Sequence, residues 1–125
     1  MAKRIVLADD NATYRESMIA NWERFCSREE IQVDFDQASD GRELVDKVIS
    51  GRYDLVFTDN AMKEVHGLRA IAQIREQNKI VPIYMISSSE AGEQALKLGA
   101  TGYLDKGDNS AFISGIERVV TTHLR

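Results

Sequence analysis

The segment LVFTD, residues 55–59, sets an acidic side chain at the end of a short apolar run. A continuous run of this length, rich in β-branched and aromatic residues, is typical of a parallel strand that helices cover on both faces. Residues 5–8 and 83–86 form two further runs of the same kind. Residues 32–36 alternate apolar and polar side chains, as an edge strand does. Residues 102–104 are expected to form a last short strand.

Helical patterns fill the intervals between these runs. Asp40 and Glu43 form a capping-box-like start to one helix, and Asp108 or Asn109 is expected to cap the last. The weakest helical pattern covers residues 90–98, a short stretch that contains a glycine. The apolar stripes of the clearest helices comprise Met18, Ile19, Trp22, Phe25, Leu44, Val45, Val48, Ile49, Leu68, Ile71, Ala72, Phe112, Ile113, Ile116, Val119 and Val120.

Five strands alternating with five helices indicate an α/β fold, a three-layer sandwich with a parallel sheet. Right-handed crossovers place helices on both faces of the sheet. The flavodoxin-like strand order 2-1-3-4-5 then puts the alternating second strand at an edge. A chain of 125 residues has the length of one domain, so we expect a single domain over residues 1–125.

The composition excludes several classes of protein. A net charge of -4 argues against a general nucleic-acid binder, which normally carries a basic excess. Cys26 is the only cysteine, so no intrachain disulfide can form. No apolar run approaches membrane-spanning length, and we therefore expect a cytoplasmic protein without membrane insertion.

Polar residues follow the strands at the points where the strands end. Asp9 and Asp10 follow the first predicted strand, Asp59 follows the third, Ser87 closes the fourth, and Lys106 comes just after the fifth. The carboxyl ends of parallel strands meet at one edge of the sheet, where open α/β folds bind their ligands. These residues are therefore expected to form one site.

The chemistry of this set is constrained by charge. Three carboxylates in one crevice repel one another, and a hard cation such as Mg²⁺, which prefers oxygen ligands, relieves that repulsion. Asp59 is a natural nucleophile, because carboxylates form aspartyl-phosphate intermediates. Lys106 could balance the charge of a phosphoryl group, and the Ser87 hydroxyl could donate to one of its oxygens.

Each of these residues also has a purely structural interpretation. An acidic or amide residue after a strand often caps the next helix, which applies to Asp10 and Asn11. A lone serine at a strand end, or a lysine in a loop, is usually structural or solvated. The convergence of four segments at one edge favours a functional site over these interpretations.

Together these motifs resemble a response-regulator receiver domain of two-component signalling, similar to the chemotaxis regulators, over nearly the whole chain. The resemblance lies in the acidic pair after the first strand, Asp59 within LVFTDNAM, Ser87, and the lysine that ends GATGYLDK. Gly67 also falls where the family has a glycine in the turn before the third helix.

The resemblance implies that Asp59 is the phosphoacceptor. A sensor histidine kinase or a histidine phosphotransfer protein would donate the phosphoryl group, and a downstream protein would bind in response. Asp10 would ligate Mg²⁺ directly, Asp9 mainly through water, and the backbone carbonyl of Ala61 would complete the protein ligands together with Asp59. Mn²⁺ is the alternative ion.

The resemblance also implies how the phosphoryl group is sensed. Ser87 and Lys106 would contact its oxygens, and Tyr103 would be the aromatic switch residue that turns inward as the hydroxyl moves toward the phosphate. An alternative interpretation of Tyr103 is an aromatic ring that covers the edge of the sheet. The chain would be no enzyme toward other molecules and would promote only its own phosphorylation and dephosphorylation.

Several positions depart from the family pattern. Gly107 replaces the usual proline after Lys106, so we expect a trans peptide bond and a looser loop there. Lys63 replaces another usual proline, and residues 27–30 resemble a small insertion. The interval from residue 87 to residue 106 is about one helical turn short, which predicts a shortened fourth helix.

These departures keep a second functional hypothesis open, a degenerate receiver that binds proteins without being phosphorylated. The intact acidic residues, together with Ser87 and Lys106, oppose it. A haloacid-dehalogenase phosphatase would need a second acid at position 61, which is alanine. A flavodoxin-like cofactor binder is disfavoured because the acids would repel a flavin phosphate. No direct contact with nucleic acid is expected.

Overall fold

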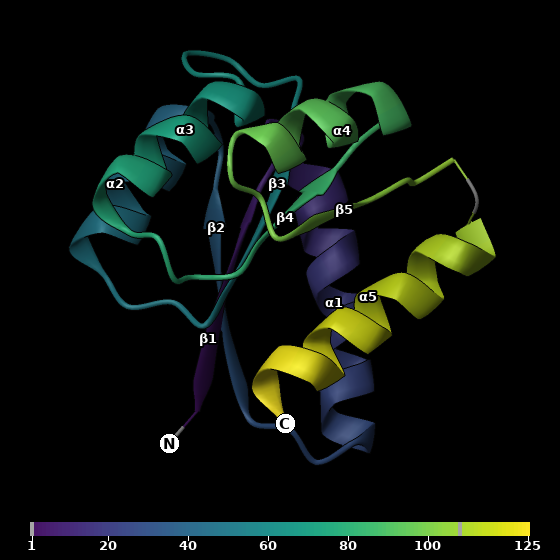
Figure 1. Ribbon diagram of the computed structural model, residues 1–125. Coiled ribbons are helices and arrows are strands. Elements are labelled where there is room, and N and C mark those ends of the chain that lie inside the picture. Colours follow the sequence, from purple (N-terminus) through teal and green to yellow (C-terminus); the bar gives the residue numbers. More distant parts are fainter. Residues whose placement is uncertain (1, 108) are drawn as a thin grey trace.

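Parallel strands in the predicted order form the centre of the protein (Figure 1). The computed structural model describes residues 2–107 and 109–125. Hydrogen bonds pair the five strands of the sheet in the order β2-β1-β3-β4-β5, and every pairing is parallel. The predicted fold class is therefore confirmed. The strands are β1 Lys3–Ala8, β2 Val33–Ala38, β3 Leu55–Asp59, β4 Ile83–Ile86 and β5 Gly102–Leu104.

The helices form a layer on each face of the sheet. In Figure 1, α1 and α5 lie on one face, while α2, α3 and α4 lie on the other. With nine residues, α4 is the shortest helix in the part of the chain that the structure describes, as its weak sequence pattern suggested. None of the described helices is long and apolar enough to cross a bilayer. The bounds are α1 Ala12–Arg28, α2 Gly41–Ser50, α3 Gly67–Gln77, α4 Ser89–Lys97 and α5 Asn109–Leu124.

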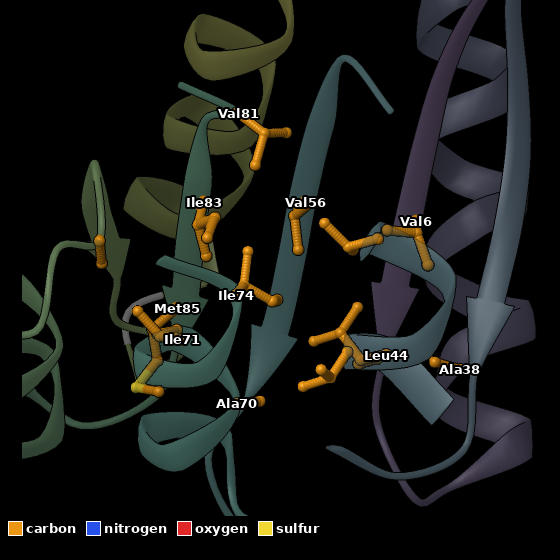
Figure 2. Packing of buried hydrophobic residues seen from close by; sticks show 14 of the residues in the cluster. Val6, Ala38, Leu44, Val56, Ala70, Ile71, Ile74, Val81, Ile83 and Met85 are labelled. Atoms are coloured by element: carbon orange, nitrogen blue, oxygen red, sulfur yellow. The ribbon is translucent and has the colours of Figure 1, made fainter. Parts of the chain in front are cut away.

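Alternate residues of each central strand face opposite helix layers, and both sets are buried. Figure 2 shows Val6, Val56 and Ile83 of neighbouring strands packed with Leu44 of α2 and Ile74 of α3. The other face carries Ile5, Leu7, Phe57 and Ile86, which pack against α1 and α5, and the ring centroids of Trp22 and Phe57 lie 4.8 Å apart. Strands buried on both faces explain why the central runs are continuously apolar.

The bounds of two predicted strands are wrong by one or two residues. The first begins at Lys3 and not at residue 5, because Lys3 and Arg4 already pair with Val33 and Asp34 of the edge strand. The second covers 33–38 and not 32–36, because Ala8 holds Ala38 in the same register. Backbone pairing thus extends both strands into residues that the apolar pattern excludes.

The capping residues predicted for α2 are confirmed, but one of their two hydrogen bonds has a different donor. Asp40 Oδ1 accepts the Glu43 N–H at 2.8 Å, as a cap should, but Glu43 Oε1 accepts the N–H of Ser39, at 2.7 Å, and not that of Asp40. Asn109 is the first residue of α5, and the predicted cap at Asp108 lies outside the described residues.

The polar side of β2 is covered by an ion pair that ties it to α2. Asp36 Oδ1 lies 2.9 Å from Lys47 Nζ, and Asp36 Oδ2 accepts a 2.5 Å hydrogen bond from the Tyr53 hydroxyl. Burial raises the pKa of Asp36, but the hydrogen bonds from Tyr53 and Lys47 outweigh it and hold the pKa below its ordinary value. The ionised form of Asp36 is therefore the one that stabilises the fold.

We predict that Asp36→Asn lowers the free energy of unfolding at pH 7 by about 1 kcal/mol, a modest value because the Asp36 side chain is 35% exposed. Because the folded pKa is lowered, this contribution is present above the unfolded pKa of about 3.9 and is lost as the pH falls through the folded value. Urea unfolding at pH 7 and pH 3 measures it. The exposed neighbour Asp34→Asn is the control, and an equal loss in both variants would contradict the prediction.

Gly67 lets α3 begin directly against the end of β3. A Cβ atom added at Gly67 would overlap the carbonyl oxygen of Asp59 and lie 2.9 Å from the Cα of Asn60. The Gly67 N–H donates to the Asn60 carbonyl at 3.0 Å, and the Leu68 N–H donates to the Asn60 side chain at 3.2 Å. The glycine is thus required by the close approach of two backbones.

Gly67→Ala is expected to destabilise the protein by about 1–3 kcal/mol, because the methyl group must displace the backbone of Asp59 or α3. Chemical denaturation measures the loss, and amide chemical-shift changes should centre on Asp59 and Asn60. Arg69→Ala, at an exposed position of the same helix, is the control. Wild-type stability in Gly67→Ala would show that the approach is not tight.

Candidate functional site

Three carboxylates meet at the carboxyl edge of the sheet. Asp9 and Asp10 follow β1, and Asp59 is the last residue of β3, which pairs with β1. One carboxylate oxygen from each residue lies within 4.8 Å of the others. Asp9 is buried, Asp10 is exposed, and Asp59 is intermediate. The structure therefore brings together the acidic residues that the strand ends predicted.

Backbone hydrogen bonds with the N-cap residue of α1 and with the end of β2 hold Asp9 in place. Asp9 Oδ1 accepts the Asn11 N–H at 2.9 Å, and the Asp9 N–H donates to the Ala38 carbonyl at 3.1 Å. Asn11 caps α1, since its side chain accepts the Tyr14 N–H at 3.0 Å. Asn11, and not Asp10, therefore has the capping role that the sequence left open for both.

Arg15 is a contact of the site that the sequence did not reveal. Its Nη1 atom donates to the backbone carbonyl of Asp9 at 2.5 Å, and its Nε atom donates to the Gln37 side chain at 2.9 Å. The guanidinium thus joins α1 to the ends of β1 and β2. Its place one helical turn after the acidic pair is a weak signal, because arginine is common on exposed helix faces.

Lys106 lies opposite Asp59. Their Nζ and Oδ1 atoms are 3.8 Å apart, and the side chain of Lys106 is 42% exposed while that of Asp59 is 15% exposed. Burial raises the pKa of Asp59, Asp9 and Asp10 raise it further, and these influences outweigh the charge of Lys106. Lys106 therefore offsets only part of the combined effect of burial and the neighbouring carboxylates on the pKa of Asp59.

Tyr14 covers Lys106 from the side of α1. The ammonium nitrogen lies 4.9 Å from the centroid of the Tyr14 ring, a cation–π contact. Burial raises the pKa of Tyr14, as do the charges of Asp9 and Asp59. This ring limits where the ammonium group of Lys106 can go, and no sequence pattern predicted it beyond an aromatic residue near the start of α1.

Ser87 and Tyr103 lie at the end of the sheet that holds β4 and β5. Ser87 is buried, its N–H donates to the Leu104 carbonyl at 3.0 Å, and its hydroxyl donates to the Ser88 carbonyl at 3.1 Å. The Tyr103 hydroxyl donates to Glu93 Oε1 of α4 at 3.2 Å. In this structure both hydroxyl groups thus point to partners outside the acidic cluster.

The two loops that flank the acidic cluster also contain predicted positions. Ala61 is an exposed residue just after β3. The Lys106–Gly107 bond is trans, as are all peptide bonds between described residues. The Gly107 N–H donates to Asp105 Oδ1 at 2.8 Å, a bond that a proline could not make. The predicted trans bond is therefore confirmed, and this hydrogen bond helps to hold the loop, while the looser loop stays a prediction.

The donor set fits a hard divalent cation. All three candidate ligands are carboxylates, they come from two adjacent strand ends, and their oxygens are close enough to share one ion. Oxygen-only ligands with net negative charge suit Mg²⁺, which keeps several waters and takes one or two carboxylates.

Comparisons with known proteins agree on one family. A family profile for the response regulator receiver domain matches residues 5–116. Response regulator MprA of Mycolicibacterium vanbaalenii is 32% identical over 109 residues, which are 85% of this chain and 45% of that protein. This chain therefore spans less than half the length of that curated relative.

Solved structures agree in fold. The response regulator TrrA of Thermotoga maritima, solved in complex with Mg²⁺ and BeF, has 28% identity and a TM-score of 0.79 over 98% of this chain and 99% of that one. The receiver domain of Saccharomyces cerevisiae Ssk1, solved with the histidine phosphotransfer signalling protein Ypd1, has 20% identity and a TM-score of 0.75 over 98% and 89% of the two chains. At that identity, the second likeness shows the fold alone.

The strand order, the acidic residues at the ends of β1 and β3 and the family profile lead to one assignment. This chain belongs to the family of response regulator receiver domains, the signalling modules of two-component systems.

Proposed function

We propose that Asp59 accepts a phosphoryl group from a phosphohistidine of a sensor histidine kinase or a histidine phosphotransfer protein, in the cytoplasm. The observation that supports this most directly is the meeting of the Asp9, Asp10 and Asp59 carboxylates, with Lys106 Nζ at 3.8 Å from Asp59. The whole of residues 1–125 would act as this one receiver domain.

The acidic cluster would hold Mg²⁺, with Mn²⁺ as a substitute. Asp10 and Asp59 would ligate the ion directly, Asp9 mainly through water, and the exposed Ala61 would add its backbone carbonyl. When bound, the ion supplies positive charge that stabilises the phosphoryl oxygens during transfer. Asp9 is suited to an indirect role because Asn11 already donates to one of its oxygens.

In the transfer step, Asp59 would act as the nucleophile. A carboxylate oxygen forms a bond to phosphorus while the P–N bond of the phosphohistidine breaks, and its electron pair goes to the imidazole nitrogen. The imidazole leaves after taking up a proton. Lys106, partly exposed and already beside Asp59, moves to an oxygen of the new phosphoryl group.

Ser87 and Tyr103 would report the phosphoryl group to a partner. The Ser87 hydroxyl would exchange the Ser88 carbonyl for a phosphoryl oxygen, and Tyr103 would turn inward into the space that this movement opens. Phosphorylation would thereby shift an existing equilibrium and change the binding of a downstream protein. The chain would act on no other substrate.

Observations on the relatives support the acceptor function over the degenerate alternative. A relative with 28% identity, the response regulator TrrA, was solved with Mg²⁺ and BeF. The present chain keeps its acidic cluster and Lys106 in contact, which a module without phosphorylation would not need.

Incubation with acetyl phosphate and Mg²⁺ should add the mass of one phosphoryl group to the intact protein. Asp59→Asn should abolish the gain, because the amide is a poor nucleophile, and a chelator should suppress it in the wild type. Asp46→Asn, at an exposed position of α2, should gain mass normally and serves as the control. A mass gain that persists in Asp59→Asn, or no mass gain in the wild type, would contradict the proposal.

A further inference from the structure

The ring of Tyr103 lies directly on the backbone of α4 at Gly92. A Cβ atom added at Gly92 would overlap the Cγ, Cδ1 and Cδ2 atoms of the ring, so no other residue fits beneath the ring in this position. Gly92 is buried, although it lies in the middle of a nine-residue helix whose neighbouring residues Glu93 and Gln94 are exposed. The contact between ring and helix is therefore as close as the backbone allows.

The next residue of the helix holds the other end of the same side chain. The Tyr103 hydroxyl donates to Glu93 Oε1 at 3.2 Å, and this hydrogen bond raises the pKa of the Tyr103 hydroxyl. A carboxylate acceptor gives a stronger bond than a neutral one. The ring face and the hydroxyl are thus both fixed by consecutive residues of α4.

Helix stability alone does not account for Gly92. Glycine weakens a helix interior relative to alanine, and this helix is already short. The Tyr103 ring, which overlaps the place of a Cβ atom at this position, gives a packing reason for the glycine. The absence of a side chain at this one position is what admits the ring.

We propose that Gly92 and Glu93 form a seat in α4 that holds the side chain of Tyr103 against this helix, so that the helix sets the balance between this position of the ring and an inward one. The seat itself rests on the contacts of Tyr103 with α4, and the inward position of the ring, together with its link to phosphorylation, rests on the proposed function. Gly92 and Glu93 are positioning residues that act through Tyr103.

The seat links two movements that would otherwise be independent. When the ring leaves α4, the helix loses its contact at Gly92 and its hydrogen bond at Glu93 together. The β5 residue Tyr103 pairs in register with Met85 of β4, two residues before Ser87, so the backbone beneath the ring is tied to the sheet. The side chain and α4 therefore have to move, and a partner that binds α4 would sense the ring.

Fluorine NMR of protein labelled with 3-fluorotyrosine tests the seat directly. The chain has four tyrosines, and Tyr103→Phe assigns the signal of interest. BeF with Mg²⁺, added to the wild type, marks the signal of the second position. In phosphate-free Gly92→Ala, we expect the Tyr103 signal to leave its wild-type position and move toward the BeF-bound one.

Glu93→Gln keeps an acceptor but removes its charge, so it should shift the same population ratio by about two- to tenfold. Gln94→Ala, on an exposed position of the same helix, should leave the Tyr103 signal unchanged. The other three tyrosine signals report whether each variant is folded. If Gly92→Ala does not fold, the comparison of Glu93→Gln with Gln94→Ala decides.

An unchanged Tyr103 signal in folded Gly92→Ala would overturn the proposal, as would equal shifts in Glu93→Gln and Gln94→Ala. A ring that only covers the edge of the sheet predicts those results. Failure of the proposed function can be told apart from failure of the seat. If the proposed function fails, the wild type gains no mass with acetyl phosphate. The phosphate-free spectra do not depend on that reaction.

Discussion

Repulsion among three carboxylates is the constraint on which the rest of the site depends. Asp9, Asp10 and Asp59 bring their oxygens within 4.8 Å of one another, and Lys106 supplies only one nearby positive charge. Burial is the main cause of the raised pKa of Asp59, and the charges of Asp9 and Asp10 add to it. A site built in this way favours a ligand that adds positive charge, and its carboxylates lie close together before such a ligand binds.

The sheet maintains that unfavourable arrangement. Ala8 and Thr58 are fully buried partners in adjacent strands, and each is followed directly by an acidic residue of the site. The backbones of Asp9 and Asp59 cannot move apart without breaking the register of two strands that are packed on both faces. Gly67 adds to this restraint, because α3 starts in contact with the backbone of Asp59. Burial of apolar surface thus offsets the electrostatic cost at the edge.

The sequence predicted the features that depend on local pattern and strand order. Continuous apolar runs predicted the strands of the sheet. The convergence of parallel strand ends predicted that the acidic residues and Lys106 lie close together. Contacts between distant segments were missed, among them the hydrogen bonds of Arg15, the ring of Tyr14 over Lys106 and the seat of Tyr103 on Gly92. These depend on side-chain direction and on the separation of helices, which no periodicity encodes.

Thermal unfolding of the wild type and of Asp59→Asn, each in chelator and in excess Mg²⁺, tests the central claim most directly. Removing one charge from the cluster should raise the Tm of the metal-free protein by about 3–5 °C, on the order of 1 kcal/mol. Mg²⁺ should raise the Tm of the wild type by more than that of the variant. A lower Tm for metal-free Asp59→Asn, with equal shifts by Mg²⁺ in both proteins, would contradict the account.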